Sequence, residues 1–304
     1  YRTDQGSVFG TTYHITYNHN ADLSTDITRV LKDVDNSLST FNANSTISLV
    51  NKNMQVELDS MFLYVFHLAQ HVAETTSGAF DITVAPAVNA WGFGFKNAET
   101  IDNDLIDSLK QIVGYQMVKE ENGAIVKEDN RIMLDCSAIA KGFGCDVVAT
   151  LFDSIGIADY MVEIGGEIVV KGLNSKGSDW RIGISKPTDD SLATETELQT
   201  VLELSDRAMA TSGNYRNFYY KDGKKYAHTI NPATCRPVNH NLLSVTVLAE
   251  NCAVADAYAT AMMVLGLERS LELCKKLENV DAYFIYQDNE GVIQICTTPD
   301  FPID

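Results

Sequence analysis

Apolar residues recur along the chain with two periods, and each period predicts one kind of element. The helical period predicts helices over 23–37, 252–265 and 267–278. Asp59 precedes another helical pattern that stops near Gly78, and Ser137 precedes one that ends at Gly156, so we expect each to cap its helix. The inward residues of the latter helix are expected to be Ile139, Phe143, Val147 and Leu151.

A period of two predicts strands, which cluster after residue 160. The predicted strands cover 7–17, 160–170, 180–186, 199–204, 215–220, 225–230, 242–249, 281–287 and 291–297. This order favours an α+β fold, in which helices pack on a mostly antiparallel mixed sheet, over a doubly wound fold. We expect a single domain over 1–304, helix-rich at about 20–115 and strand-rich at about 116–304.

The composition is that of a globular chain with an acidic surface. Of 304 residues 45% are hydrophobic, and 41 acidic residues outnumber 23 basic ones, for a net charge of −18. Such a charge repels nucleic acid and anionic membranes, so we expect no nucleic-acid partner. The apolar runs are too short for a transmembrane segment. Six cysteines form no CxxC motif, and we expect most of them to be buried free thiols.

Asp256 and Thr260 are four residues apart on an apolar helical pattern, so they share one helix face. A carboxylate and a hydroxyl are hard oxygen ligands suited to Mg²⁺. An acid on an alanine-rich helix is also typical of a cap, a solvated side chain or a helix–helix hydrogen bond. The spacing alone leaves these alternatives open.

Three other segments carry candidate chemistry. Residues 134–144 place an acid, a hydroxyl and a lysine near a helix start, where free N–H groups attract anions. His228 lies in a turn-rich stretch, where a histidine is either structural or an acid–base group. Gly165 and Gly166 interrupt a strand pattern, which is typical of a bulge unless a ligand approaches the backbone. With Asp256 and Thr260, residues 134–144 and the stretch 226–241 that contains His228 predict a metal-assisted site for a phosphorylated ligand.

Eight segments in succession resemble the motifs of a known family. They read FGTTYHITY (9–17), LSTFNANSTISLVN (38–51), SGAFDITVAPAVNAWGFG (77–94), LDCSAIAKGFGCD (134–146), VEIGGEIVVKG (162–172), ATSGNYRNF (210–218), YAHTINPATCRPVNHNLLSVTV (226–247) and ADAYATAMMVLG (255–266). In this order they resemble the FAD:protein FMN transferases, the ApbE family of flavin transferases. The resemblance runs from about Phe9 to the last strand and so covers nearly the whole chain.

The resemblance implies a phosphoryl transfer from FAD. A Thr or Ser hydroxyl of an acceptor protein attacks the phosphorus on the FMN side, with Mg²⁺ at the pyrophosphate, and AMP leaves. By resemblance, Mg²⁺ is held by Asp256, Thr260 and the Ala138 carbonyl, and His228 is the candidate base. The residues implied to contact FAD are Phe9, Phe41, Ala79, Phe80, Asp81, Asp135, Lys141 and Ile230. Because FAD is anionic and the chain is acidic, a local cation is expected at the site.

The resemblance also implies partners and a location. The acceptors are flavin-carrying subunits of membrane redox complexes, and the protein is expected to be exported, on the periplasmic side and lipid-anchored in its full-length form. A chain that begins at Tyr1 without Met fits a removed leader. Two alternatives remain open: a Mg²⁺-dependent FAD pyrophosphatase that yields FMN and AMP, and a flavin-binding protein without chemistry.

Overall fold

The computed structural model describes residues 1–94, 101–187, 197–214, 218–221 and 224–303. The chain divides into two compact units. Unit 1 comprises Tyr1–Lys32, Lys141–Asn217 and His240–Asp304, and unit 2 comprises Asp33–Ala140 and Phe218–Asn239. Unit 1 takes both ends of the chain, so the units do not follow the expected division into helix-rich and strand-rich halves. The expectation of one domain over 1–304 stays a prediction.

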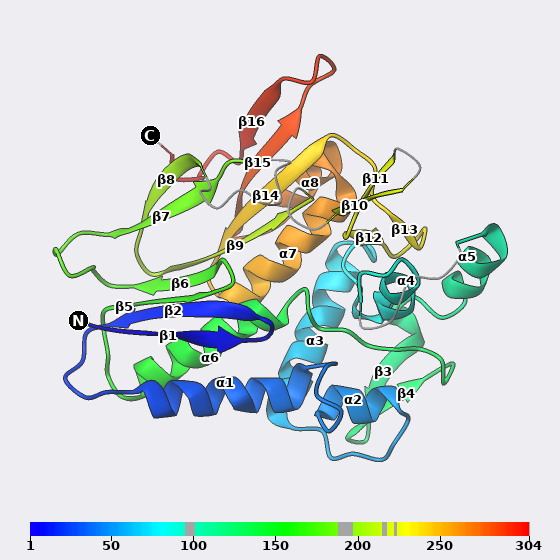
Figure 1. Ribbon diagram of the computed structural model, residues 1–304, viewed down its shortest axis with the longest axis horizontal. Helices are drawn as coiled ribbons and strands as arrows, with labels where there is room; N and C mark the ends of the chain where they lie inside the picture. The colour runs from blue at the N-terminus through cyan, green and yellow to red at the C-terminus, as the bar shows by residue number, and fades with distance from the viewer. Residues whose placement is uncertain (95–100, 188–196, 215–217, 222–223, 304) are drawn as a thin grey trace. The chain divides into compact units, whose positions relative to one another are not determined.

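Unit 1 holds most of the described strands, whose labels appear in Figure 1. Its elements are β1 (Arg2–Val8), β2 (Thr11–Tyr17), α1 (Ser24–Leu38), α6 (Ala140–Ser154), β5 (Tyr160–Ile164), β6 (Glu167–Lys171), β7 (Trp180–Ser185), β8 (Leu198–Leu204), β9 (Arg207–Gly213), β14 (Leu242–Ala249), α7 (Cys252–Leu265), α8 (Leu267–Cys274), β15 (Asp281–Gln287) and β16 (Ile293–Thr297). Helix α1 has residues in both units.

Among the described residues, unit 2 holds helices of 6 to 16 residues and three two-stranded ribbons. Its helices are α2 (Thr46–Asn51), α3 (Ser60–Thr75), α4 (Ala85–Ala90) and α5 (Asn103–Lys110), with 3-10 turns at Ile82–Val84 and Tyr115–Met117. Its ribbons pair β3 (Val118–Glu121) with β4 (Ala124–Lys127), β10 (Phe218–Lys221) with β11 (Lys224–Ala227), and β12 (Ile230–Asn231) with β13 (Arg236–Pro237).

An eight-stranded sheet in the order β1-β2-β5-β6-β9-β14-β15-β16 forms the centre of unit 1. Every neighbouring pair in this sheet is antiparallel. The expected α+β fold with a mostly antiparallel sheet is therefore confirmed. Short turns join β1 to β2, β5 to β6 and β15 to β16, whereas longer segments of the chain join β2 to β5, β6 to β9, β9 to β14 and β14 to β15.

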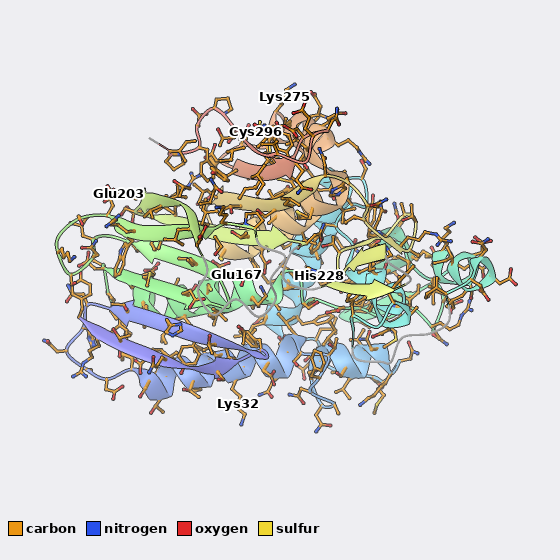
Figure 2. All side chains as sticks on the ribbon, turned by 45° about the horizontal axis from the view of Figure 1, so that its top comes forward. Lys32, Glu167, Glu203, His228, Lys275 and Cys296 are labelled. Carbon is orange, nitrogen blue, oxygen red and sulfur yellow. The ribbon has the colours of Figure 1, made fainter. Side chains whose placement is uncertain are left out.

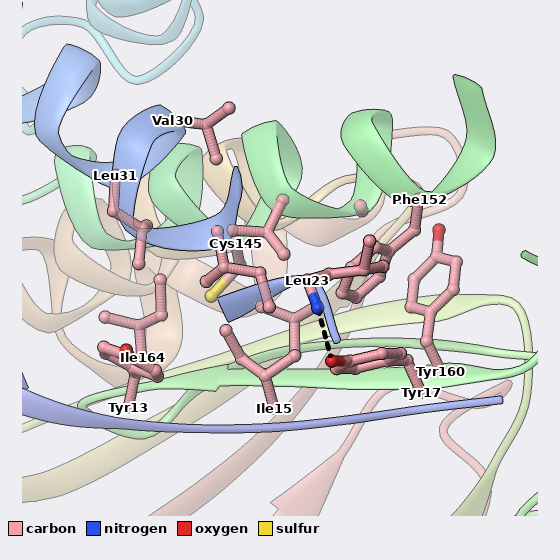
Figure 3. Close-up of a cluster of buried hydrophobic side chains, with 14 of the residues drawn as sticks. Tyr13, Ile15, Tyr17, Leu23, Val30, Leu31, Cys145, Phe152, Tyr160 and Ile164 are labelled. Carbon is pink, nitrogen blue, oxygen red and sulfur yellow. Dashed lines mark hydrogen bonds between the residues drawn. The ribbon is translucent and has the colours of Figure 1, made fainter. Parts of the chain in front are cut away.

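Alternation along the strands gives the sheet two apolar faces. On one face, β2 and β5 pack against α1 and α6 through Tyr17, Phe152 and Tyr160, among others, and the Leu23 N–H donates to the Tyr17 hydroxyl at 3.1 Å (Figure 3). α7 packs on the neighbouring strands β9 and β14. On the other face, the β7–β8 hairpin contributes Trp180, Ile182 and Leu202 to a second core. Each fully buried large side chain contributes roughly 1.5–3 kcal/mol to stability.

Two predicted strands are hairpins instead. Residues 7–17 contain the last two residues of β1, a turn and the whole of β2, because Phe9 (φ +52°) and Gly10 (φ +74°) adopt left-handed conformations and reverse the chain. Residues 160–170 form most of β5 and β6, because Gly165 (φ +63°) and Gly166 (φ +103°) make the turn. In both places apolar and polar residues alternate through the turn, so the pattern does not reveal where the strand ends. β9 was not predicted, and residues 215–217 of the expected strand 215–220 lie outside the described residues.

The predicted helices agree with the structure more closely. Asp59 caps α3 and accepts from the Phe62 N–H at 2.9 Å, and helix 252–265 has the bounds of α7. The Ser137 cap is wrong, because α6 begins at Ala140. The predicted apolar face is only partly correct, since Val147 and Leu151 are half-buried. The buried face of α6 contains Gly142, Phe143, Gly144, Cys145, Val148, Ala149 and Phe152.

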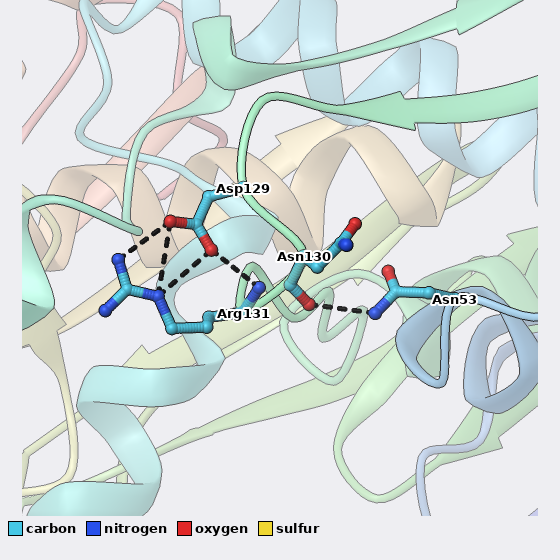
Figure 4. Close-up of polar contacts among 4 residues, drawn as sticks. All are labelled: Asn53, Asp129, Asn130 and Arg131. Carbon is cyan, nitrogen blue, oxygen red and sulfur yellow. Dashed lines mark hydrogen bonds and ion pairs between the residues drawn. The ribbon is translucent and has the colours of Figure 1, made fainter.

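Unit 2 is held together by side chains that bond the backbone. Asn51 both donates to the Leu134 carbonyl at 2.8 Å and accepts from its N–H at 2.7 Å. The Trp91 indole donates to the Cys235 carbonyl at 2.8 Å and links α4 to the β12–β13 ribbon. Asn53 donates to the Asn130 carbonyl at 2.9 Å (Figure 4). These bonds satisfy backbone groups that no ladder or helix reaches.

All six cysteines are free, and Cys136, Cys145, Cys235 and Cys252 are buried, as predicted. Among the described residues, none of the helices is both long and apolar enough to span a membrane.

Candidate functional site

The candidate site in unit 1 begins where α6 crosses α7. The crossing is close because residue 142 is glycine: a Cβ there would lie 2.3 Å from the Cys252 carbonyl oxygen. Asp256 of α7 accepts a hydrogen bond from the Gly142 N–H at 3.1 Å, and the side chain is only 4% exposed. The helix–helix hydrogen bond left open by the sequence is therefore present. It brings the predicted metal ligand beside Lys141 at the start of α6.

Asp146 of α6 makes a second contact with α7. Its two oxygens accept from the backbone N–H groups of Cys252 and Ala253, each at 2.8 Å, at the N-terminus of α7. A carboxylate at this end also interacts favourably with the helix dipole. Burial raises the pKa of Asp146 to about 6. The position of Asp256 is thus set by two contacts between the helices.

Glu167 is the functional residue that the sequence reasoning missed. It starts β6, is labelled in Figure 2, and lies on the helix-covered face, because its neighbour Ile168 belongs to the core of the opposite face. Its side chain is buried, and its Oε1 lies 2.5 Å from Lys141 Nζ. A charged residue on the inward side of a strand pattern, directly after Gly165-Gly166, was the signal available.

Burial and mutual interaction set the charges of this cluster, which consists of Lys141, Glu167 and Asp256. Burial raises the pKa of Glu167 to about 8; the Asp256 carboxylate adds to this rise, and Lys141 opposes it. Burial also raises the pKa of Asp256, against the effects of Lys141 and the Gly142 N–H. For Lys141, burial lowers the pKa, but Asp256 and Glu167 outweigh burial and leave it above its ordinary value. Lys141 therefore stays charged at neutral pH.

The oxygen donors of this cluster fit a divalent cation. Thr260 lies one turn after Asp256 on α7, and its hydroxyl is 3.2 Å from that of Ser212 on β9. Glu167 Oε2 is buried and has no hydrogen-bond partner among the described residues. Carboxylate and hydroxyl oxygens are ligands that Mg²⁺ accepts, together with water. The described part of the chain holds no group of three or more His, Cys, Asp or Glu that could bind a metal, so backbone, hydroxyl or water ligands would complete the set.

Phe9 also belongs to unit 1, in the β1–β2 turn. It is half-buried against the core of the helix-covered face, and a Cβ at Gly144 would lie 2.7 Å from its ring. Its positive φ of 52° is uncommon for a side chain with a Cβ and makes it a strained position. Its predicted contact with FAD stays a prediction.

Asp81, in unit 2, already has partners for both of its carboxylate oxygens. Oδ1 accepts from the Thr83 N–H at 2.8 Å and from the Thr83 hydroxyl at 2.7 Å, and Oδ2 accepts from the Tyr115 N–H at 2.7 Å. Burial raises its pKa. In this structure Asp81 joins the turn at Ile82–Val84 to the turn at Tyr115–Met117. A role in FAD binding would therefore act at least partly through these turns.

Asp135 and Ala138 lie in the segment of unit 2 that precedes α6. The Asp135 N–H donates to the Ile82 carbonyl, and Asp135 Oδ1 accepts from the Ser137 N–H, each at 2.8 Å. Burial of the carboxyl group raises the pKa of Asp135, whereas the residue as a whole is half-buried. Asp81 directly precedes Ile82, and Asp135 is hydrogen-bonded to the Ile82 carbonyl, so both acids lie next to the backbone of Ile82. Ala138 is half-buried in the turn before α6.

The other predicted flavin contacts in unit 2 differ in exposure. Ala79, Phe80 and Ile230 are buried, and Ile230 belongs to the core formed with Trp91 and Cys235. Phe41, in contrast, is 79% exposed. An exposed phenyl ring is available for a planar ligand, whereas buried rings and methyl groups contribute mainly to packing.

The two histidines of the 226–241 segment have different surroundings. His240 Nε2 lies 2.8 Å from the Met263 carbonyl oxygen at the end of α7, which gives it a structural contact in unit 1. His228, labelled in Figure 2, is half-buried in the bend after β11 of unit 2. Its assignment as a base stays a prediction.

Comparisons with known proteins agree on one family. The ApbE family model matches residues 9–284. The FAD:protein FMN transferase of Vibrio cholerae is 40% identical over 297 residues, which cover 94% of this chain and 87% of that protein. The protein of the same name from Haemophilus influenzae is 36% identical, with coverages of 95% and 87%.

Solved structures of ApbE proteins share the fold of this chain. The structure of the flavin transferase ApbE from Vibrio cholerae matches with a TM-score of 0.89 at 36% identity, covering 99% of this chain and 97% of that one. The apo form of the Pseudomonas stutzeri flavinyl transferase ApbE matches with a TM-score of 0.86 at 28% identity, with coverages of 98% and 94%. The resemblance seen in eight segments thus extends over the whole fold, and the chain belongs to the ApbE family.

Proposed function

We propose that the protein transfers the FMN part of FAD to a hydroxyl of an acceptor protein and releases AMP. The observation that carries this proposal is the similarity to relatives named FAD:protein FMN transferase over almost their full length. Lys141 supports it, because a site for a pyrophosphate in an acidic protein needs a cationic group. The buried carboxyl groups of Glu167 and Asp256 beside Lys141 are oxygen donors of the kind that a divalent cation accepts.

The reaction forms one P–O bond and breaks another. The acceptor oxygen attacks the phosphorus on the FMN side, the bond to the AMP phosphate breaks, and His228 takes the hydroxyl proton. Lys141, which stays charged, stabilises negative charge on the phosphoryl oxygens. Mg²⁺, held by Asp256, Thr260 and the Ala138 carbonyl, would supply a Lewis acid for the same oxygens. Phe9, Phe41, Ala79, Phe80, Asp81, Asp135 and Ile230 are proposed to bind FAD directly or through their neighbours.

The proposal extends to the acceptor and the location. We expect the acceptors to be flavin-carrying subunits of membrane redox complexes, and the full-length protein to act on the periplasmic side as a lipid-anchored form. Both expectations come from the family resemblance.

Mass spectrometry of a candidate acceptor tests the proposed reaction. The protein, FAD, Mg²⁺ and an acceptor domain are incubated together, and we expect the acceptor to gain one FMN while AMP appears in equal amount. An Asp256→Ala variant should lose most of this activity. Free FMN and AMP without labelled acceptor would instead indicate a pyrophosphatase, and FAD recovered intact would indicate a binding protein.

A further inference from the structure

Glu167 stands out because half of its carboxylate has no partner. The side chain is 3% exposed, Oε1 contacts Lys141 at 2.5 Å, and Oε2 makes no hydrogen bond among the described residues. Buried polar atoms nearly always have a partner, and an unpaired one calls for an explanation such as an ion. Oε2 can therefore accept a hydrogen bond from a further donor or coordinate a cation.

The charge balance of the cluster points to the same conclusion. One lysine, Lys141, faces the two buried carboxyl groups of Glu167 and Asp256. Burying a carboxylate without compensation is unfavourable by several kcal/mol, in order of magnitude, even after the protein relaxes. Lys141 can compensate only one of these carboxylates. The remaining negative charge favours a bound cation.

We infer that Glu167 is a positioning residue for the divalent cation proposed above. Through Oε1 it holds Lys141, and through Oε2 it presents a second carboxylate oxygen to the cation or to water bound by the cation. The inference rests on the proposed function, since it concerns the same cation. The competing explanation is that Glu167 only pairs with Lys141 and has no part in cation binding.

A Glu167→Gln variant separates these explanations without measuring transfer. Glutamine keeps the size and can still accept from Lys141, but it removes the charge. We expect the affinity for Mg²⁺, measured by calorimetry on the FAD-free protein, to fall by about 10–100-fold, as for other residues that support metal ligands. Unfolding of the cation-free variant should occur at the same or a higher temperature, because a buried charge has been removed.

Glu272→Gln is the matched control. Glu272 also pairs with a lysine, Lys275, at 2.5 Å in unit 1, but both side chains are exposed. This variant should bind Mg²⁺ like the wild type. An unchanged affinity in Glu167→Gln as well would overturn the inference and leave the proposed function intact, whereas a wild type that binds no Mg²⁺ would overturn the cation and the inference together.

Lys141→Met provides a second test, because here the Mg²⁺ affinity is not expected to fall. Removing the lysine leaves the carboxylates without their cationic partner, so the affinity for Mg²⁺ should stay the same or rise while the cation-free protein becomes less stable. A lower Mg²⁺ affinity in this variant would contradict the inference, even if Glu167→Gln failed to fold. If Glu167 served Lys141 alone, both variants would lose cation-free stability and neither would change Mg²⁺ affinity.

Discussion

At the scale of single residues, Asp81 illustrates how a predicted ligand contact can have a structural role. Its oxygens receive hydrogen bonds from Thr83 and Tyr115 within unit 2. The residue type and the resemblance were read from the sequence, but one of the partners, Tyr115, lies 34 positions away along the chain. A substitution of Asp81 therefore tests the fold and the site at once.

We predict that Asp81→Ala destabilises the protein by about 2–5 kcal/mol, because it leaves the Thr83 and Tyr115 N–H groups without their charged acceptor. Urea unfolding measures this change, and flavin fluorescence titration measures the accompanying loss of FAD affinity. Asp107→Ala is the control, since Asp107 is an exposed residue of the same unit. A fully stable Asp81→Ala variant with weakened FAD binding would show direct ligand contact instead.

Asp129 and Arg131 give a prediction for pH. The Arg131 guanidinium and N–H hold the pKa of Asp129 at about 2 (Figure 4). Because this pKa is depressed, the contribution to stability is present above the ordinary pKa of 3.8 and is lost as the pH falls towards 2. We expect Arg131→Met to raise the pKa of Asp129, as measured by carboxyl NMR titration.

Asp22 serves as the internal reference for this titration. Its pKa is also lowered, mainly by the Ser24 N–H, and should not respond to Arg131→Met. An unchanged pKa of Asp129 in the variant would mean that the backbone N–H of residue 131, and not the guanidinium, lowers this pKa.

At the scale of elements, strong helical periodicity was sufficient to predict α1, α3 and α7. Turns inside a continuous alternation were not predictable from that alternation, because Phe9 and the Gly165-Gly166 pair adopt positive φ angles without breaking it. β9 has the sequence RAMATSG, whose small residues show no clear period. Likewise Lys141 and Asp256 were found from their spacing and resemblance. Glu167 was missed, because its importance depends on a long-range contact with Lys141.

We predict that Gly142→Ala destabilises the protein by about 1–3 kcal/mol, although alanine is the better helix former. The added methyl group would lie 2.3 Å from the Cys252 carbonyl oxygen, and that backbone is held by Asp146. The shift should also weaken the Gly142–Asp256 hydrogen bond and lower Mg²⁺ affinity. Thermal unfolding and calorimetry measure the two effects.

Thr150→Ala on the exposed side of the same helix is the control for Gly142→Ala, and it should change stability by less than about 0.5 kcal/mol. A Gly142→Ala variant as stable as this control would mean that α6 and α7 can separate without loss.

At the scale of the whole molecule, the division into units was not predictable from local patterns. Each unit is assembled from segments far apart in the chain, and the boundary near Lys141 falls at the start of a helix. Composition, in contrast, is a global property that the sequence gives directly. The net charge of −18 predicts how an anionic substrate approaches.

We predict that FAD associates faster as NaCl rises from about 10 to about 150 mM, in chelator and without Mg²⁺. The charge of −18 repels the pyrophosphate, and the screening length shortens from about 30 to about 8 Å over this range. Stopped-flow flavin fluorescence measures the rate. Riboflavin carries the same ring system without phosphates, so its association should be independent of salt. If salt slowed FAD and left riboflavin unchanged, local attraction by Lys141 and other cations would outweigh the net charge, and the prediction would be wrong.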